Sequence, residues 1–250
     1  MKFIEIPNIP EEKVVLAIVD GRINNSLEKG FMANGIQIIK TKLHPSLYNS
    51  VASHPDMFLH HIGGKNIVYA PGTSEDTVRE LEKYCFRLVR GETELENKYP
   101  GNISYNAARV GKFVFHNTNY TDNTLKKFFS KLDVELVHVN QGYAKCAISV
   151  VDENSIITMD RGIAKIADKK GLDVLVVEEK NILLKGLDYG FIGGSSGLLD
   201  KNTWAVSGNF ETLGACLKIM EFVCNKGKKI ISLSDQQIVD IGSPIPICSC

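Results

Sequence analysis

The sequence predicts an α/β fold built from about five copies of one unit, in which two strands are followed by a helix and a third strand. Three observations lead to this prediction. The same order of elements returns along the chain, equivalent strands are spaced by about 40 to 55 residues, and each helix follows a hairpin rather than a single strand. The hydrophobic share of 44% and the charged share of 23% are those of an ordinary globular chain. We therefore expect residues 1–250 to form one domain.

The first complete copy of the unit lies between residues 57 and 89. The Gly63-Gly64 turn separates its first two strands, and its helix has Val78 and Leu81 at helical spacing behind a Ser/Thr start signal. This copy comprises strands at residues 57–61, 66–70 and 86–89 and a helix at 76–84.

Three further copies follow with the same order of elements. Gly171 and Gly227 end the helices of two of them. The second copy comprises strands at residues 102–109, 112–116 and 134–138 and a helix at 122–131. The third comprises strands at 146–151, 155–159 and 173–177 and a helix at 161–170. The fourth begins at Phe191 and the Gly193-Gly194 turn and comprises strands at 203–207 and 229–233 and a helix at 211–225.

The two ends of the chain together supply the remaining copy. Strands predicted at residues 14–19 and 36–39 flank a helix at 24–33, but this copy has no first strand of its own. The apolar C-terminal segment 238–247 is left over. We predict that this segment supplies the missing strand and closes the copies into a ring.

The main alternative is a doubly wound parallel sheet, which needs one strand per helix. The hairpin before each helix argues against it. The glycine-rich segment 190–197 is followed by a strand pattern that begins at Thr203, so it does not open a helix that binds phosphate. The sequence therefore predicts neither a dinucleotide-binding fold nor a P-loop, and no cofactor.

Net charge and cysteine content narrow the classes of partner and location. Basic and acidic residues number 29 each, so no net charge attracts nucleic acid or an anionic membrane surface. The first residues lack the apolar segment of a signal peptide and the longest apolar runs are strand-sized, so we expect a cytoplasmic protein. We expect most cysteines and Trp204 in the core. Cys248 and Cys250 are expected to be frayed terminal thiols, because no second pair stands at zinc spacing.

Five segments of the chain are similar to a known family. They are His54-Pro55-Asp56-Met57, segment 102–112, segment 141–146, segment 190–197 and Asp240-Ile241-Gly242-Ser243. Over nearly its whole length the chain resembles the pentein, or guanidine-modifying enzyme, superfamily, and within it a clostridial-type branch. The resemblance implies a five-bladed α/β propeller with pseudo-fivefold symmetry. For catalytic members such as deiminases, dimethylarginine hydrolases and amidinotransferases, it implies a cysteine nucleophile, a histidine acid/base and carboxylates that hold a guanidinium.

The resemblance also implies a place for the nucleophile on the last core strand, where this chain has Gly242, Ser243 and Pro244. Cys248 lies beyond two prolines that donate no strand hydrogen bonds, so its use would need a shift in register. The sequence therefore leaves open whether this chain is an enzyme.

Polar residues on the first strand of each copy are the site candidates, because these strands line the central channel of such a ring. His54, His60 and His61 are half of the six histidines, although alternating strand faces let at most two converge. A cation at Lys145 favours the thiolate of Cys146, but neighbours on a strand point to opposite faces, which favours a core cysteine instead.

Amides and glycines supply candidates for substrate binding. Asn102 and Asn106 are expected on one strand face, where the guanidinium of Arg109 would help them bind a carboxylate or amide; turn capping is the alternative. Segment 193–196 offers backbone N–H groups to an oxyanion, or merely lets strands approach closely. The predicted catalytic residues are His54, Asp56, His60, Asn106, Cys146 and Asp240. The predicted substrate-binding residues are Asn102, Arg109, Gly193, Gly194, Ser195, Ser196 and Ser243. No metal ligand is predicted.

Two functions remain open from the sequence. The first is a hydrolase or deiminase-like enzyme that acts on a small polar nitrogenous substrate in the central channel. The second is a non-catalytic ring that binds or assembles with a partner, like the ribosome anti-association factors that share the fold. The oligomeric state is not predicted.

Overall fold

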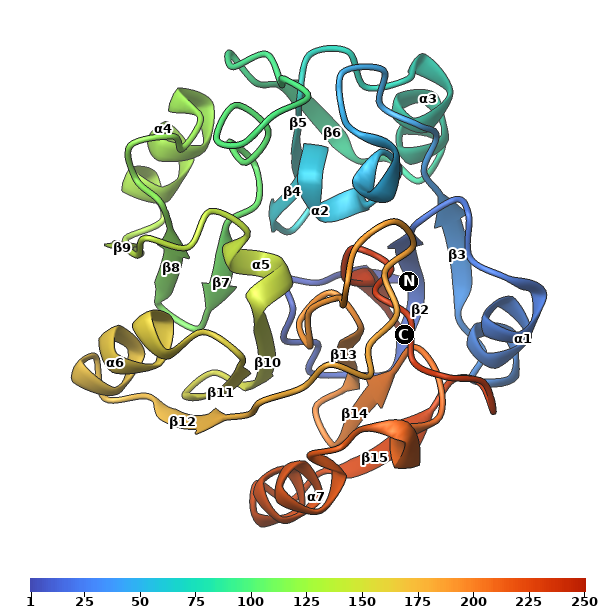
Figure 1. Cartoon of the computed structure of the whole chain (residues 1–250). Helices are drawn as coiled ribbons and strands as arrows, with labels where there is room; N and C mark the ends of the chain where they lie inside the picture. The colour runs from blue at the N-terminus through green and yellow to red at the C-terminus, as the bar shows by residue number, and fades with distance from the viewer.

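The computed structural model describes residues 1–250 and contains five small β-sheets arranged in a ring (Figure 1). Each sheet has an antiparallel pair of strands and a further strand that runs parallel to the second strand of the pair; in four of the five sheets the antiparallel pair is a hairpin. In every sheet the first strand lies toward the centre of the ring and the long helix lies on the outside (Figure 1). The predicted fold class is confirmed.

The five units follow the chain. Unit 1 contains β2 (Val14–Val19), α1 (Asn25–Ala33), β3 (Gln37–Lys40) and, from the other end of the chain, β16 (Ile245–Ser249). Unit 2 contains α2 (Pro55–Phe58), β4 (Leu59–Gly63), β5 (Asn66–Tyr69), α3 (Glu75–Lys83) and β6 (Arg87–Arg90). Unit 3 contains β7 (Ala108–Val110), β8 (Phe113–His116), α4 (Asn123–Lys131) and β9 (Glu135–His138). Unit 4 contains α5 (Ala144–Ala147), β10 (Ile148–Asp152), β11 (Ser155–Thr158), α6 (Arg161–Lys169) and β12 (Asp173–Val176). Unit 5 contains β13 (Ser196–Asp200), β14 (Thr203–Val206), η2 (Phe210–Thr212), α7 (Cys216–Asn225) and β15 (Lys229–Ser232).

The outer helices begin at polar capping residues. Asn24, Ser74, Asp122 and Asp160 each accept a hydrogen bond from a backbone N–H in the first turn of the helix that follows. Helix α7 has no side-chain cap from its N-cap residue, Ala215. A carboxylate from a distant part of the chain lies at this end of the helix instead, since Glu179 accepts a hydrogen bond from the N–H of Ala215. None of the seven α-helices combines the length and hydrophobicity needed to cross a bilayer.

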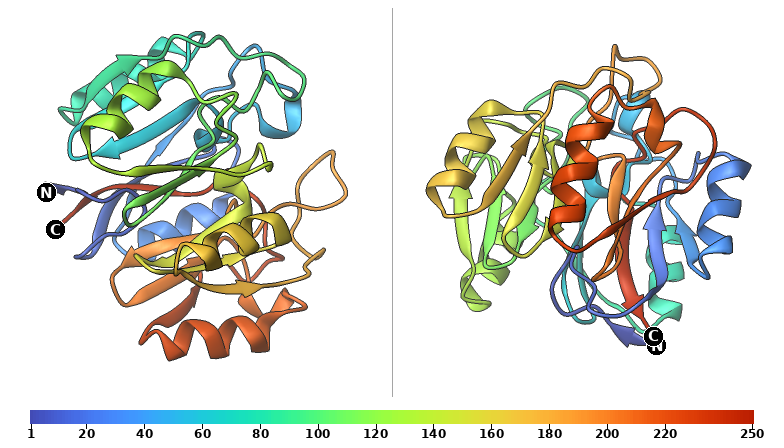
Figure 2. Two further views of the ribbon diagram at one scale, coloured as in Figure 1. Left: turned by 90° about the vertical axis from the view of Figure 1, so that its left-hand side faces the viewer. Right: turned by 90° about the horizontal axis from the view of Figure 1, so that it is seen from below.

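The C-terminal strand closes the ring, as predicted, but it begins later than expected. Strand β16 starts at Ile245 rather than at residue 238 and pairs antiparallel with β2. The short β1 (Lys2–Phe3) pairs with its other edge, so the two termini lie side by side (Figure 2). The expectation of a frayed Cys248 is wrong: β16 includes this residue and buries its thiol, whereas Cys250 is exposed.

Several predicted strands and helices have different bounds. Residues 55–58 and 144–147 form the short helices α2 and α5 in place of the first residues of two strands. Pro55 at the first helical position favours the helix in α2, because its missing N–H would be unpaired there anyway. Residues 101–107 form turns, so the first strand of unit 3 is reduced to β7. The helix predicted at 211–225 is split into η2 and α7.

The expectation of core cysteines is only partly confirmed. Cys146 and Cys248 are buried, but Cys85 and Cys224 are exposed. Cys85 has a φ of 64° and ends the turn after α3, and Cys224 lies on the outer face of α7, so neither side chain reaches the core. Trp204 is completely buried, as predicted.

Buried histidines give the fold a pH dependence that can be measured. Burial lowers the pKa of His116 to about 4, against the opposing hydrogen bond to the Ile103 carbonyl. The unfolded chain takes up this proton near pH 6.5, so stability contributed by neutral His116 is complete above pH 6.5 and is lost as the pH falls toward 4.

We expect His116→Gln to flatten the pH dependence of stability. Between pH 7 and 4.5 the wild-type protein should lose about 2.5 kcal/mol more than the variant, at about 1.4 kcal/mol per pH unit for one proton. Urea unfolding at the two pH values measures this difference. His60 and His61, whose pKa values burial lowers to about 3 and about 4, add to the loss in both proteins alike. Equal pH dependence in the two proteins would contradict the neutral, buried His116.

Candidate functional site

Five chain segments meet at the centre of the ring, and each lies just before the first strand of its unit. Because the first strands converge there, the residues that precede them face one another across the axis. In unit 5 the residue at this position is a glycine, and in each of the other four units it has a polar side chain. We call the following residues the axial cluster: Asp56, Asn106, Cys146, Gly194 and Ser243, all buried or without a side chain.

Hydrogen bonds join the axial cluster into one network. The Cys146 thiol lies 3.1 Å from Oδ2 of Asp56, and the Ser243 hydroxyl lies 3.1 Å from the same oxygen. The Asn106 amide Nδ2 lies 3.2 Å from Cys146 Sγ, and its Oδ1 accepts a 2.9 Å bond from the backbone of Lys145. The Gly194 N–H donates to the carbonyl of Cys146, and its own carbonyl accepts from the N–H of Ser243. The thiol is therefore held by an acceptor on one side and a donor on the other.

His54 lies beside the axial cluster, between two carboxylates. It caps α2 immediately before Pro55, so its backbone is fixed by the start of that helix. Its Nδ1 lies 3.8 Å from Asp240 Oδ1, and its Nε2 lies 3.5 Å from Asp20 Oδ2. An imidazole placed in this way can exchange a proton with a ligand while either carboxylate stabilises its charged form.

Both carboxylates that face His54 are held by other groups. Asp240 accepts hydrogen bonds from the backbone N–H groups of Phe191 at 2.8 Å and Gly242 at 3.0 Å. Asp20 forms a 2.7 Å salt bridge with Arg22 and accepts a hydrogen bond from Ser53. Burial alone would raise the pKa of Asp20, but these hydrogen bonds and the nearby imidazole hold it below its usual value.

Glycine is required where backbone crosses the axis. A Cβ atom on Gly194 would lie 2.1 Å from Asp240 Oδ1. Gly242 has a φ of 66°, and a Cβ atom there would lie 2.3 Å from the Cβ of His54. These two glycines let the segments of units 5 and 1 approach the histidine and carboxylate at distances that no other residue allows.

Burial dominates the electrostatics of the site. It raises the pKa of Asp56, which the nearby Lys145 ammonium opposes, and it raises the pKa of Asp240, which His54 opposes. It raises the pKa of the Cys146 thiol well above its usual value, and both carboxylates raise it further. Burial lowers the pKa of His54, and Asp240 opposes this effect. These side chains by themselves therefore favour a neutral thiol, and a cation brought beside it would favour the thiolate.

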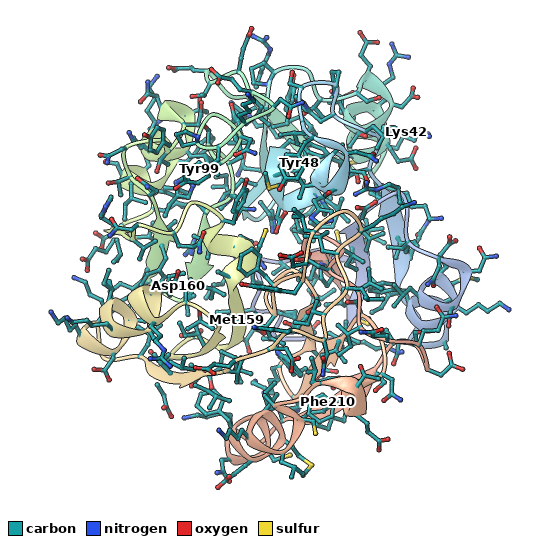
Figure 3. The ribbon with its side chains drawn as sticks, viewed as in Figure 1. Lys42, Tyr48, Tyr99, Met159, Asp160 and Phe210 are labelled. Atoms are coloured by element: carbon teal, nitrogen blue, oxygen red, sulfur yellow. The ribbon has the colours of Figure 1, made fainter.

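A pocket of about 370 Å³ opens on one side of the axial cluster. Its polar groups are His54, Cys146, Asp188 and Asp240, and its other walls are mainly aromatic and aliphatic. We call it the front pocket. Tyr48, one of its lining residues, lies over the region of α2 in unit 2, whereas Phe210 lies in unit 5 (Figure 3). The remaining walls are Tyr48, Val51, Tyr143, Leu184, Leu187, Tyr189 and Phe191.

A second, much smaller cavity of about 20 Å³ lies on the opposite side of Asp56. It is lined by Asp56, His60, His61 and Lys145 among others, and it shares no lining residue with the front pocket. Oδ1 of Asp56, Nε2 of His60 and Nδ1 of His61 are buried without a hydrogen-bond partner. This volume is enough for about one water molecule and too small for an organic substrate.

The structure brings together part of the predicted site. His54, Cys146 and Asp240 line the front pocket, and Asp56, Asn106 and Ser243 are bonded around the thiol. Gly193 and Gly194 approach them closely through backbone atoms. His60 is separate, because it lines the small cavity and packs against Phe129.

The remaining predicted substrate-binding side chains do not line the front pocket. Asn102 and Asn106 do not share a strand face, because residues 101–107 form turns; Asn102 bonds to the Tyr143 hydroxyl instead. Arg109 donates to the carbonyl of Gly111. Ser195 and Ser196 bond to backbone carbonyls at residues 191 and 192.

Sequence reasoning missed the aromatic walls and Asp20. No local pattern distinguishes Tyr48, Tyr143 or Phe191 from core residues, because their role depends on contacts between distant units. The segment that carries Leu184 and Tyr189 also had no periodic signal. It is held over the pocket by a parallel bridge between Leu183 and Val239.

Two larger hollows lie at the edges of the ring and contain none of the predicted site residues. One of about 630 Å³ is lined by α7 and the end of β12, and one of about 660 Å³ is lined by β3 and α3. The front pocket is therefore the hollow that combines a nucleophile, an imidazole and a carboxylate.

Comparison with known proteins assigns the fold. A family model described as "Family of unknown function (DUF6873)" matches residues 18–245. No curated protein sequence matches this chain. The solved inosamine-phosphate amidinotransferase of Streptomyces griseus is 10% identical, with a TM-score of 0.63 over 100% of this chain and 97% of that chain.

Two further solved structures have the same fold. An amidinotransferase of the saxitoxin biosynthetic pathway from Microseira wollei is 13% identical, with a TM-score of 0.57 over 92% of this chain and 91% of that chain. Agmatine deiminase from C. jejuni is 11% identical, with a TM-score of 0.53 over 93% and 90%. The resemblance to the pentein fold is thereby confirmed, and identities this low establish the fold alone. The clostridial-type branch stays a prediction.

Proposed function

We propose, from the premise that this chain belongs to the DUF6873 family of unknown function and has the pentein fold, that it is a cysteine-dependent hydrolase. Its substrate is a small planar C–N cation, a guanidine or an amidine, bound in the front pocket. One observation supports this most: Cys146, His54 and Asp240 line a single pocket, and the thiol of Cys146 lies 3.1 Å from a carboxylate oxygen of Asp56.

The substrate cation activates the thiol in this proposal. A guanidinium or amidinium is held by the carboxylate of Asp240, and its charge favours the thiolate of Cys146 by Coulomb attraction. Asp56 accepts the thiol proton, because its Oδ2 lies within hydrogen-bonding distance of Sγ. The amide of Asn106 donates to the sulfur and stabilises its negative charge.

The reaction then follows in two steps. The Cys146 sulfur bonds to the central carbon of the substrate. His54, in the protonated form that Asp240 and Asp20 stabilise, donates a proton to one nitrogen, and the C–N bond breaks so that this nitrogen leaves as an amine or as ammonia. Water, deprotonated by His54, then adds to the carbon of the thioimidate. The C–S bond breaks, the added hydroxyl gives its proton to the released amine or to water as the carbonyl forms, and the sulfur takes back the proton held by Asp56. The net change is hydrolysis of a C–N bond, which yields a urea from a guanidine or an amide from an amidine.

A second candidate function is a ring that binds its ligand without reaction. It is favoured by the burial of the thiol, since Cys146 is 3% exposed and burial raises its pKa well above its usual value, which disfavours the thiolate. Such a protein would bind a cation in the front pocket but release no product.

Turnover assays with purified protein separate these functions. We expect release of ammonia or amine, with formation of a urea or amide, from at least one member of a panel of guanidines and amidines. His54→Gln should lower kcat at least about 10²-fold, because it removes the group that transfers the proton. The control is His138→Gln, which changes an exposed histidine outside the site and should leave kcat unchanged. Ligand-induced thermal shifts without turnover across the panel would contradict the hydrolase and support the binding ring.

A further inference from the structure

Apart from the imidazole of His54, the ionisable groups with a full charge at neutral pH in the front pocket are all acidic. Its acidic groups are Asp188 and Asp240, and no lysine or arginine lines it. Asp240 lies deep beside His54, whereas the exposed Asp188 lies on the outer segment over the pocket. A ligand that enters therefore meets one carboxylate at the mouth and another at the base.

The basic side chains around the front pocket either bind other groups or lie outside the pocket. The guanidinium of Arg22 bonds to Asp20 and to the backbone carbonyls of Asn49 and Ser50. Lys145 lies beside the small cavity on the opposite side of Asp56. Lys185 is on the same outer segment as Asp188 but is exposed and does not line the pocket. No cation is thus placed to accept a substrate carboxylate.

The walls between the two carboxylates are apolar and aromatic. Tyr48, Tyr143 and Phe191 form one part, and Leu184 and Leu187 of the outer segment form another. Aliphatic and aromatic groups are stabilised on such walls by the area they bury, and a cation is further attracted by the faces of the rings. A carboxylate placed here would lose its water and meet no lysine or arginine side chain.

We propose that the substrate is a guanidine or amidine whose tail has no carboxylate and is apolar or ends in a second cation that faces Asp188. This inference rests on the proposed function for the identity of the reacting group. It separates the substrate from guanidino amino acids and guanidino acids, which carry a carboxylate on the tail.

Matched pairs of ligands test the inference by binding alone. Agmatine and arginine differ by one carboxylate, and so do propylguanidine and 4-guanidinobutyrate. We expect the carboxylate-free member of each pair to bind at least about 10-fold more tightly to the Cys146→Ser variant, measured by calorimetry, where no turnover consumes the ligand. On the wild-type protein the same order should hold for kcat/KM.

Reversing the charge of Asp188 at the mouth of the front pocket tests whether this residue causes the preference for carboxylate-free ligands. Asp188→Lys should reduce the 10-fold preference for agmatine over arginine to about 3-fold or less. The matched control is Asp168→Lys, which makes the same change of net charge on the outer helix α6 and should keep the preference. Lys185→Ala should also keep it, because this lysine does not line the pocket.

The outcomes distinguish the two proposals. Tight binding of carboxylate-free probes without any turnover would overturn hydrolysis and leave the specificity supported. Equal or tighter binding of arginine and 4-guanidinobutyrate would overturn the specificity, whatever the turnover. Failure of every guanidine and amidine to bind would overturn both.

Discussion

Cys146→Ser is expected to lower turnover at least about 10³-fold while the protein keeps its fold and its affinity for the substrate. The serine hydroxyl is a much weaker nucleophile than a thiolate, and Asp56 is a weak base for removing its proton. Its size and its ability to hydrogen-bond Asp56 and Asn106 preserve the axial cluster. Turnover, circular dichroism and ligand-induced thermal shift on the same preparation measure the three quantities.

Cys248→Ser provides the matched control for this variant. Cys248 is also buried, and burial raises its pKa to about 11, but it lies in β16 opposite Leu16 and outside the front pocket. We expect the buried hydroxyl to lower the free energy of unfolding by about 1–2 kcal/mol. We expect kcat to stay at the wild-type value. If activity survives Cys146→Ser but falls in Cys248→Ser, the nucleophile is Cys248 of the closing strand β16 and not Cys146.

Gly194→Ala is expected to destabilise the fold by about 3 kcal/mol and to abolish turnover. The new Cβ would lie within 2.5 Å of the carboxyl atoms of Asp240, and this carboxyl group cannot move without breaking its hydrogen bonds to the N–H groups of Phe191 and Gly242. Urea unfolding measures the stability, and turnover below the midpoint measures the effect on the site.

Gly162→Ala is the control for this substitution. Gly162 lies in the first turn of α6, where a Cβ would meet only Asp160 Oδ1 at 3.0 Å, so alanine should change stability by less than about 1 kcal/mol. A Gly194→Ala protein with wild-type stability and turnover would show that the segments do not meet at the axis as described.

The order of elements was predictable because it depends on local signals. Turn glycines, capping residues and the spacing of apolar side chains mark each unit, and these signals act within about ten residues. The closing strand was predictable for a different reason, since unit 1 lacked one strand and the C-terminal segment was left over. Its start was misplaced because residues 240–244 form the turn that brings Gly242 and Ser243 to the axis.

The short helices before the first strands could not be predicted from periodicity. Helices α2 and α5 have four residues each, about one turn, which is too short to show a repeating pattern. They matter for the site because they aim Asp56 and Cys146 along the axis rather than to opposite faces of a strand. Cys146 is buried as predicted, but the argument from alternating strand faces does not apply to it, because it lies in α5.

Repetition of the unit explains where the candidate nucleophile lies. The family resemblance implies a cysteine on the last core strand, and the matching segment of this chain has Gly242, Ser243 and Pro244 instead. Cys146 precedes the first strand of unit 4 and reaches the same axis as Ser243, with Asp56 between the two in the hydrogen-bond network. In a ring of similar units, residues at equivalent positions face one centre, so a nucleophile can be supplied from more than one unit. The local sequence around Ser243 does not indicate that the candidate nucleophile lies in a different unit.

The rate of alkylation at individual cysteines tests the central claim most directly. Chloroacetamidine and chloroacetamide deliver the same leaving group to a thiol, but only the first carries a planar cation. The exposed Cys250 serves as an internal reference within each protein. Peptide mass spectrometry should show an amidine-to-amide rate ratio at Cys146 at least about 10-fold higher than at Cys250, and Asp240→Asn should remove this difference. Equal ratios at the two cysteines, or no labelling of Cys146 by the amidine, would contradict a cation-activated thiol at the axis of the ring.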